Sequence, residues 1–381
     1  MKILVAPDSF KGSMTSVEAS ESIARGIISA YPDIRVKKLP LSDGGEGLVD
    51  CLVKATGGNM LSKTVTGPLG NPVVAPWGIL GDNKTAVIEM ASASGLLLLP
   101  EEKRDPRFTT TYGTGELIKA ALDKKCINII LGLGGSATND GGSGMVQALG
   151  AELLNRDGEP IPFGGSALAE LDKIDTGNLD PRIEAVTFQV ACDVDNPLTG
   201  EKGASVVFGP QKGATPEMVT ELDRALSHYA EIIKRDLNRD VEHMPGAGAA
   251  GGVGAGVVAF LNGKLTSGID LVLEAVGLEK ELTDCDLIIS GEGKFDAQSA
   301  YGKVPVGVAR LAKKFQVPVI ILAGSVYKIT EQLHEKGITA CFSIINEPMP
   351  LEVAMTRGSE LLEFTAGQLL RLFAAPGRPN R

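Results

Sequence analysis

The chain has 381 residues, of which 43% are hydrophobic and 22% charged, a composition that excludes a largely disordered protein. Its net charge of -10, without any basic stripe, argues against nucleic acid as a partner, because phosphate backbones require clustered Lys and Arg. The five cysteines are scattered, odd in number and never form a C-x-x-C pair, so neither a disulfide framework nor a zinc site is expected.

The first apolar run, residues 1–6, meets Pro7 and Asp8 and is too short for the core of a signal peptide. The longest uncharged apolar stretch, residues 247–261, falls below the ~20 residues that span a bilayer. We therefore expect a cytoplasmic protein without a membrane partner. At this chain length, two domains are the natural expectation.

The N-terminal part alternates between strand and helix patterns. Residues 2–7 form a short apolar run typical of a buried parallel strand. The capping-box pattern at residues 15–18 predicts a helix over 16–30. A second strand is predicted over 36–41, and a second helix ends near Thr56, before two glycines.

The middle of the chain changes pattern. Between residues 64 and 90, short β-branched runs separated by Gly, Pro and Asn turns predict antiparallel hairpins. Helices over 114–124 and 216–237 then alternate with strands over 127–133 and 188–192. The middle is therefore predicted to be mixed α/β.

Near the end, three buried strands are predicted at 286–290, 317–323 and 340–345, followed by an amphipathic helix over 351–373. The two strands at the start and these three are each too few for a covered sheet, but together they make one of about five strands. The predicted fold is thus α/β. A discontinuous Rossmann-like parallel-sheet domain (1–64 and 285–381) carries an inserted mixed α/β domain (65–284), with the active site in the cleft between them.

The strongest candidate phosphate site follows the strand predicted over 127–133. Its glycine-rich loop ends where a helix is expected to begin, near Gly144, and backbone N–H groups and the helix dipole favour anions there. A glycine turn that only lets the helix pack tightly on the strand is the alternative. The residues predicted to contact ATP are Gly134, Gly135, Ser136, Thr138, Asn139 and Asp140.

Acidic residues also follow predicted strands, at the sheet edge where ligands usually bind. One group follows the second strand and comprises Asp43, Gly44, Gly45 and Glu46. Another follows the strand over 286–290 and comprises Gly291, Glu292, Lys294 and Asp296. Carboxylates and a lysine near phosphate suit magnesium binding, charge neutralisation and proton abstraction. An Asp turn and an exposed, salt-bridged loop are the alternatives.

Three further segments supply candidates. Asp193 follows the strand over 188–192 and is a candidate magnesium ligand, with an Asx turn as the alternative. Lys11 and Lys212 lie in turns where a cation can meet the substrate carboxylate or ATP phosphates. Gly248 and Gly251 belong to a G-x-G-x-x-G segment without a preceding apolar strand, so a nicotinamide cofactor is not expected, while an approach to phosphate stays open.

Several motifs are absent. The sequence contains no G-x-x-x-x-G-K-[ST] loop, no H-R-D and D-F-G set and no G-x-S-x-G elbow. None of the three histidines lies in a glycine loop, so a His-based triad or zinc site is not expected. Any general base is therefore expected to be a carboxylate.

An ordered series of short motifs covers residues 1 to about 345. It includes APDSFKGSMT (6–15), LSDGGEG (41–47), LGGSATNDGG (133–142), ACDVDNPLTG (191–200), GASVVFGPQKGA (203–214), PGAGAAGG (245–252) and SGEGKFD (290–296). In this order the motifs resemble the bacterial glycerate kinase family that makes 2-phosphoglycerate, with Lys294 where Arg is common. The resemblance implies ATP-dependent phosphorylation of D-glycerate with Mg²⁺, in sugar-acid or glyoxylate catabolism.

Physical reasoning assigns the roles. Asp43 or Asp296 is the candidate base, and Asp193 or Glu292 the candidate magnesium ligand. A second set, Lys11, Lys212 and Lys294, balances charge. The other predicted contacts to glycerate or ATP are Ser9, Gly44, Gly45, Glu46, Gly248, Gly251 and Gly291.

Two rival functions remain. The GLGGSATN segment is also similar to the GLGSSA phosphate loop of galactokinase-type enzymes, although the rest of the chain does not follow that family. A bilobed solute-binding protein would also use discontinuous α/β domains, but such proteins usually carry an export signal. The residues leave open which hydroxyl accepts phosphate and whether the chain forms a homo-oligomer.

Overall fold

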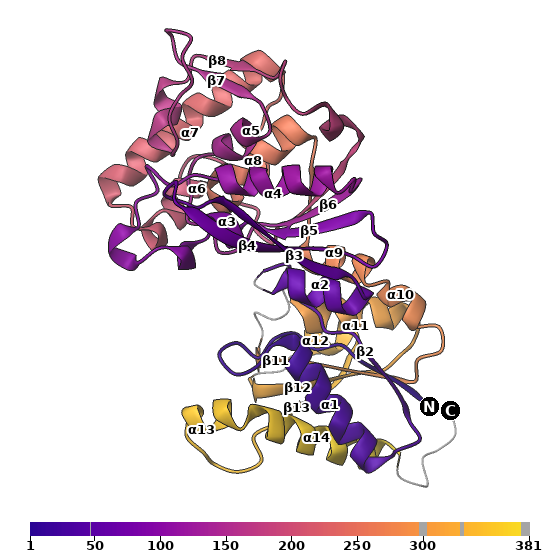
Figure 1. Ribbon diagram of the computed structural model, residues 1–381. Helices are drawn as coiled ribbons and strands as arrows, with labels where there is room; N and C mark the ends of the chain where they lie inside the picture. Colours follow the sequence, from indigo (N-terminus) through magenta and orange to yellow (C-terminus); the bar gives the residue numbers. More distant parts are fainter. Residues whose placement is uncertain (46, 297–302, 328–330, 375–381) are drawn as a thin grey trace. The chain divides into compact units, whose positions relative to one another are not determined.

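The computed structural model describes residues 1–45, 47–296, 303–327 and 331–374 (Figure 1). Contacts divide the chain into unit 1, Met1–Asp43 with Ile269–Arg381, and unit 2, Gly44–Gly268. The sequence-based boundaries at 64/65 and 284/285 fall inside unit 2 and unit 1. Glu46, a predicted contact, lies outside the described residues.

Unit 1 is built on a five-stranded parallel sheet. Its strands run in the order β13-β12-β11-β1-β2. They are β1 (Lys2–Val5), β2 (Arg35–Lys38), β11 (Leu287–Phe295), β12 (Val319–Val326) and β13 (Ile338–Ser343). The prediction that the first two and last three strands share one sheet is confirmed.

Helices cover the unit 1 sheet. Helices α1 (Ser16–Ala30) and α14 (Gly358–Phe373) lie side by side (Figure 1). Their side chains share a core with alternate residues of β1, β11 and β12. The predicted capping box starts α1, since Thr15 Oγ1 accepts from the Glu18 N–H and the Glu18 carboxylate accepts from the Thr15 N–H. The other helices are α9 (Gly268–Ala275), whose first residue belongs to unit 2, α10 (Leu278–Glu281), α11 (Val304–Lys314), α12 (Glu331–Glu335) and α13 (Leu351–Thr356). The prediction of a single helix over 351–373 is wrong, because the helix is interrupted at Arg357, between α13 and α14.

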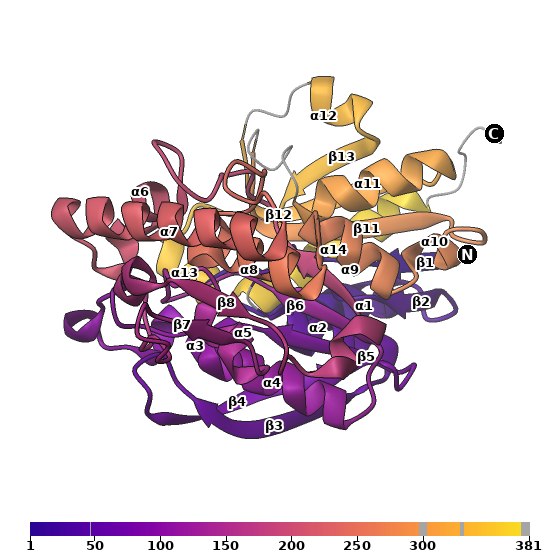
Figure 2. The same cartoon turned by 90° about the horizontal axis from the view of Figure 1, so that it is seen from above.

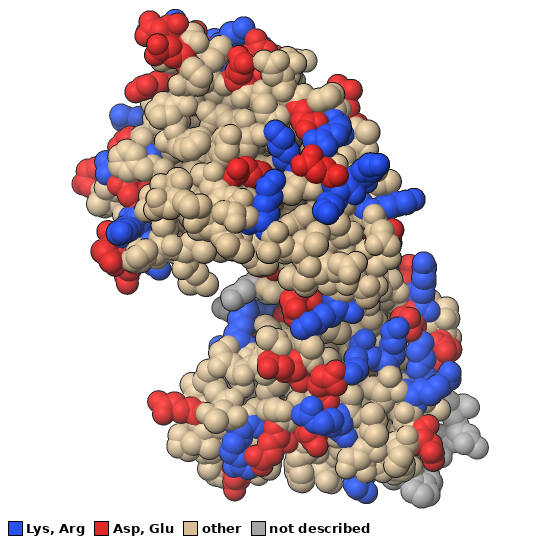
Figure 3. Space-filling model, in the orientation of Figure 1, with Lys and Arg blue, Asp and Glu red and all other residues tan. Residues whose placement is uncertain are grey.

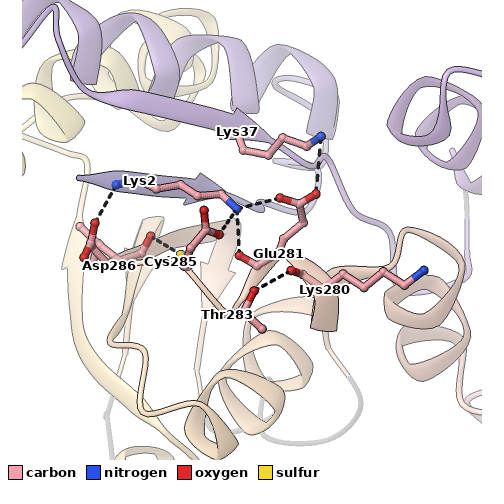
Figure 4. A network of polar contacts seen from close by, with 9 residues as sticks. Lys2, Lys37, Lys280, Glu281, Thr283, Cys285 and Asp286 are labelled. Carbon is pink, nitrogen blue, oxygen red and sulfur yellow. Dashed lines mark hydrogen bonds and ion pairs between the residues drawn. The ribbon is translucent and has the colours of Figure 1, made fainter.

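A charged network fixes the start of β1 in the sheet (Figure 4). The Lys2 ammonium donates to Glu281 Oε2 at 2.9 Å and to Asp284 Oδ1 at 2.6 Å. The Lys2 backbone N–H donates to Asp286 Oδ2 at 2.7 Å. The network ties β1 to the segment that leads into its neighbour β11.

Unit 2 contains a six-stranded mixed sheet in the order β10-β9-β6-β5-β4-β3 (Figure 2). Strands β3, β4 and β5 form the predicted antiparallel hairpins. Strands β6, β9 and β10 follow in the sheet and run parallel to β5. The strands are β3 (Asn59–Thr66), β4 (Pro72–Ile79), β5 (Thr85–Glu89), β6 (Asn128–Gly132), β9 (Thr187–Ala191) and β10 (Lys264–Thr266). The predicted mixed α/β middle is confirmed.

The remaining elements of unit 2 pack around this sheet. Its helices are α2 (Leu48–Thr56), α3 (Ala91–Ser94), α4 (Tyr112–Asp123), α5 (Ser143–Ala148), α6 (Ala204–Phe208), α7 (Pro216–Leu237) and α8 (Ala249–Leu261). A small antiparallel pair joins β7 (Glu152–Leu154) to β8 (Lys173–Asp175). The bounds of α7 agree with the prediction, because Thr215 caps its start and Asn238 ends it in the left-handed region.

Charges of both signs are interspersed on the face drawn in Figure 3. Of the helices that the structure describes, none combines the length and the apolar character needed to cross a bilayer.

Candidate functional site

In unit 1, the segments after β1 and β2 meet the C-terminal half of β11 at the carboxyl edge of the sheet. The Asp8 N–H donates to the Gly291 carbonyl of β11 at 2.8 Å, and the Leu41 N–H donates to the Pro7 carbonyl at 2.9 Å. These bonds hold the two segments and β11 together. Asp8 consequently lies within electrostatic range of three of the predicted site residues, Asp43, Glu292 and Lys11.

Asp8 is a candidate site residue that the sequence analysis missed. Its side chain is 6% exposed, and its Oδ1 accepts a hydrogen bond from the Ser9 N–H at 2.6 Å. Burial, reinforced by the negative charges of Asp43 and Glu292, raises the pKa of Asp8 to about 7. A carboxylate that titrates near neutral pH suits a general base. The available signal was the one used for Asp43, an acid directly after a parallel strand.

The segment 290–296 differs from its prediction as a loop. Residues up to Phe295 belong to β11 and pair with β12. A Cβ at Gly291 would lie 2.1 Å from the Leu322 carbonyl oxygen, so only glycine fits there. Gly291 therefore has a packing role, and its carbonyl holds the backbone of Asp8.

Two buried carboxylates at the end of β11 each have a lysine partner. The ammonium of Lys294 lies 3.0 Å from Asp296 Oδ2, and that of Lys303 lies 3.0 Å from Glu292 Oε2. Sequence reasoning missed Lys303, which precedes α11. Together with the exposed Lys11, these lysines place positive charge beside the acids.

In unit 2, the predicted phosphate loop follows β6 and is hydrogen-bonded to the segment around α3. The Leu96 N–H donates to the Gly135 carbonyl at 2.8 Å, and the Ala137 N–H donates to the Ser94 carbonyl at 2.9 Å. Gly134 and Gly135 are exposed, and within the described part of the chain their N–H groups donate no hydrogen bond. Gly135 has a φ of 72°, which favours glycine. The loop therefore presents two free donors to solvent.

A second glycine pair lies against this loop. A Cβ at Gly134 would be 3.3 Å from the Gly45 Cα, and one at Gly132 would be 3.1 Å from the Gly44 carbonyl oxygen. The structure thus brings Gly44 and Gly45, which the sequence analysis assigned to one loop, next to the loop of Gly134.

Lys212 lies beneath the loop rather than on its surface. Lys212 is only 1% exposed. Its Nζ donates to Ser136 Oγ at 2.9 Å and to the Thr138 carbonyl at 2.6 Å. Burial lowers the pKa of Lys212 to about 7, although the charge of Asp140 acts in the opposite direction.

The other polar residues of the loop are also buried. Asp140 accepts hydrogen bonds from the Thr111 N–H and Oγ1, both at 2.8 Å, and Asn139 Nδ2 donates to Ser205 Oγ at 2.9 Å. Thr138, Asn139 and Asp140 are 0% exposed. We therefore interpret these three predicted ligands as supports of the loop rather than as contacts to the substrate.

The remaining candidates of unit 2 have packing roles. A Cβ at Gly248 would lie 2.2 Å from the Pro197 carbonyl oxygen, and one at Gly251 would lie 2.0 Å from that of Thr138. Asp193 Oδ1 accepts from the Gly268 N–H at 2.9 Å. Close backbone contacts thus account for both glycines.

Over residues 1–45, 47–296, 303–327 and 331–374, no three His, Cys, Asp or Glu side chains form a group that could hold a metal ion. Mg²⁺, however, is usually held by only one or two carboxylates together with substrate phosphates and water. The donor set of Asp43 and Glu292 at the edge of the unit 1 sheet fits that chemistry.

Comparisons with known proteins agree over nearly the whole chain. The model of the glycerate kinase family matches residues 3–374. The chain is 52% identical to a glycerate kinase of Bacillus subtilis (strain 168), covering 96% of each chain, and 53% identical to a glycerate 2-kinase of Escherichia coli (strain K12), covering 93% of each. A crystal structure described as a glycerate kinase 2 from Salmonella typhimurium LT2 superposes with a TM-score of 0.91 at 50% identity, covering 98% of both chains.

We predict that Asp8→Asn stabilises the metal-free protein at pH 8. Because the folded state raises the pKa of Asp8 from 3.8 to about 7, the native state binds this proton more tightly than the unfolded chain does. Stability is therefore lost as the pH rises from about 4 to about 7, and Asn removes that loss. In urea unfolding with EDTA, the free energy of unfolding of Asp8→Asn should exceed that of wild type by about 1–3 kcal/mol at pH 8. This difference should shrink toward pH 4.

The exposed residue Asp33 supplies the control, since Asp33→Asn should leave the pH dependence of stability unchanged. An Asp8→Asn variant less stable than wild type at pH 8 would show that the Asp8 charge is well solvated in the native protein.

Proposed function

Because this chain belongs to the glycerate kinase family, we propose that it transfers the γ-phosphoryl group of ATP to the 2-hydroxyl group of D-glycerate. Membership makes the chain a phosphotransferase with an alcohol group as acceptor. ATP as donor, the 2-hydroxyl as acceptor and a place in sugar-acid or glyoxylate catabolism are the proposed parts. The observation that carries the proposal is the pair of free N–H groups at Gly134 and Gly135, with the buried ammonium of Lys212 beneath.

This arrangement suits a phosphate group. Backbone N–H groups that have no partner among the described residues are available to phosphate oxygens, and they need no reorganisation when the ligand arrives. The positive charge of Lys212 reaches the same loop through Ser136. We assign this loop of unit 2 to the phosphates of ATP.

The carboxylates of unit 1 supply the proton chemistry. As the glycerate hydroxyl oxygen bonds to the γ-phosphorus, the bond from phosphorus to the leaving ADP oxygen breaks, and a base takes the hydroxyl proton. Asp8 joins Asp43 and Asp296 as a candidate base. We favour Asp8, because Asp296 is paired with Lys294 and burial raises the pKa of Asp8 to about 7.

Charge balance involves the other residues of the same edge. Mg²⁺, when bound, would neutralise phosphate charge. For its ligand we favour Glu292 over Asp193, because Glu292 lies within electrostatic range of the candidate base Asp8 in unit 1, whereas Asp193 belongs to unit 2. Lys11 and Lys294 would then anchor the glycerate carboxylate.

The product identifies the reaction. We expect ADP release in a coupled assay with ATP, Mg²⁺ and D-glycerate, and a phosphorus NMR spectrum of 2-phosphoglycerate. A 3-phosphate product would overturn the assignment of the hydroxyl. Turnover with a galactose-type sugar but not with glycerate would overturn the substrate.

Asparagine substitutions identify the base. The variant that removes the base should lower kcat by about 10²–10⁴-fold while the fold is retained, and we expect this of Asp8→Asn. Asp43→Asn and Asp296→Asn are measured alongside it, with Asp33→Asn as the control. Near-normal turnover in all three site variants would exclude a carboxylate base at this edge.

Substitution of Gly135 tests the phosphate loop. Gly135→Ala and Gly158→Ala both place a side chain at positive φ, 72° and 79°, but Gly158 lies in an open turn of unit 2. Both should cost about 1 kcal/mol of stability. Only Gly135→Ala should raise the KM for ATP, by about tenfold or more, because one hydrogen bond to a charged phosphate is worth that factor. Equal kinetics for the two variants would remove this loop from the ATP site.

A further inference from the structure

The buried side chain of Lys212 has no direct contact with an anion among the residues that the structure describes. Its ammonium group has two acceptors in the described part of the chain, Ser136 Oγ and the Thr138 carbonyl, and both are neutral. No described carboxylate oxygen lies within 4.0 Å of its Nζ. Since an ammonium group has three N–H donors, one of them lacks an acceptor. A buried charge of this kind is unfavourable until an anion approaches it.

Among the described carboxylates, Asp140 is the one whose charge acts on Lys212. Its oxygens already accept hydrogen bonds from Thr111 and from the Gly142 and Gly144 N–H groups. Asp140 is thus committed to the base of the loop and is not a direct partner of the lysine.

Tyr229 and Arg104 belong to segments around Lys212. Tyr229 on α7 packs its ring against Gly141, and burial raises its pKa, so it stays neutral. The backbone of Arg104 lies beside Gly213, the next residue after Lys212, since its carbonyl oxygen would lie 2.3 Å from a Cβ there, and its side chain is a cation. Neither group supplies the missing anion.

We propose that Lys212 is a positioning residue for the nucleotide phosphate, and that phosphate binding at Gly134 and Gly135 draws a proton from solvent onto its Nζ. This inference rests on the proposed phosphate site. Lys212 acts through Ser136 and the Thr138 carbonyl, so the lysine forms no bond to the nucleotide. The phosphate serves as the counter-ion, a role that no described carboxylate fills by direct contact with Lys212.

A lysine with a purely structural role would behave differently. It would hold the loop equally in the free and bound protein, and its protonation would not change on binding. In contrast, a lysine that takes up a proton makes nucleotide binding weaker as the pH rises. The dissociation constant should then increase by up to tenfold per pH unit above about pH 7, because one proton must be taken from solution for each nucleotide bound.

Calorimetric titration of the full chain with MgADP at pH 8 tests this inference. The titration is repeated in buffers of different ionisation enthalpy, so that the number of protons taken up can be extracted. For wild type we expect an uptake of about half a proton or more per nucleotide. Lys84→Met is the matched control, because Lys84 is exposed and directly precedes β5, at the opposite end of that strand from the loop. This variant should take up as many protons per nucleotide as wild type.

Two substitutions at position 212 complete the test. Lys212→Arg should bind MgADP with no more uptake than the nucleotide itself causes, because arginine stays charged. Lys212→Met should show the same loss of uptake and bind at least about tenfold more weakly. If Lys212→Arg does not fold, the comparison of wild type with Lys212→Met decides.

Wild type that binds MgADP with the same proton uptake as Lys212→Met would overturn the inference while leaving the proposed kinase intact. Wild type that binds neither MgADP nor MgATP would instead overturn the proposed phosphate site, and the inference with it.

Discussion

Burying an ionisable side chain costs free energy unless a partner replaces the water that it loses, and the described residues of each unit include a buried side chain that has no oppositely charged partner in direct contact. In unit 1, Asp8 is held next to Asp43 and Glu292 at the end of β1. In unit 2, Lys212 lies beneath the glycine loop with only neutral acceptors. Burial raises the pKa of Asp8 to about 7 and lowers that of Lys212 to about 7. A protein selected for stability alone would replace both, so their presence is best explained by ligands that complete them.

The sequence predicted the elements whose signals are local. The capping box at Thr15 and the cap at Thr215 determine where α1 and α7 begin, and both helices form with the expected bounds. Strand counting also predicted the shared five-stranded sheet, because neither end of the chain could form a covered sheet alone. The extension of β11 to Phe295 escaped prediction, since it depends on backbone pairing with β12 and not on apolar side chains.

The candidate site was harder to predict residue by residue. Glycine serves both ligand approach and close backbone packing, and only the structure separates Gly135, which is exposed, from Gly248, which packs against the Pro197 carbonyl. Asp8 was missed for a related reason. Its burial follows from the order of strands in the sheet, and no local pattern around a short polar loop reveals that order.

The test that matters most is whether Lys212 becomes protonated when the nucleotide phosphate binds. NMR of the chain with ¹³C-labelled lysine side chains, with the Lys212 signal assigned by its loss in Lys212→Arg, measures this charge directly. The account predicts that the Lys212 signal titrates near pH 7 in the free protein and at a clearly higher pH with MgADP bound. A Lys212 signal that titrates at the ordinary lysine pKa near 10.5 in the free protein would contradict the account.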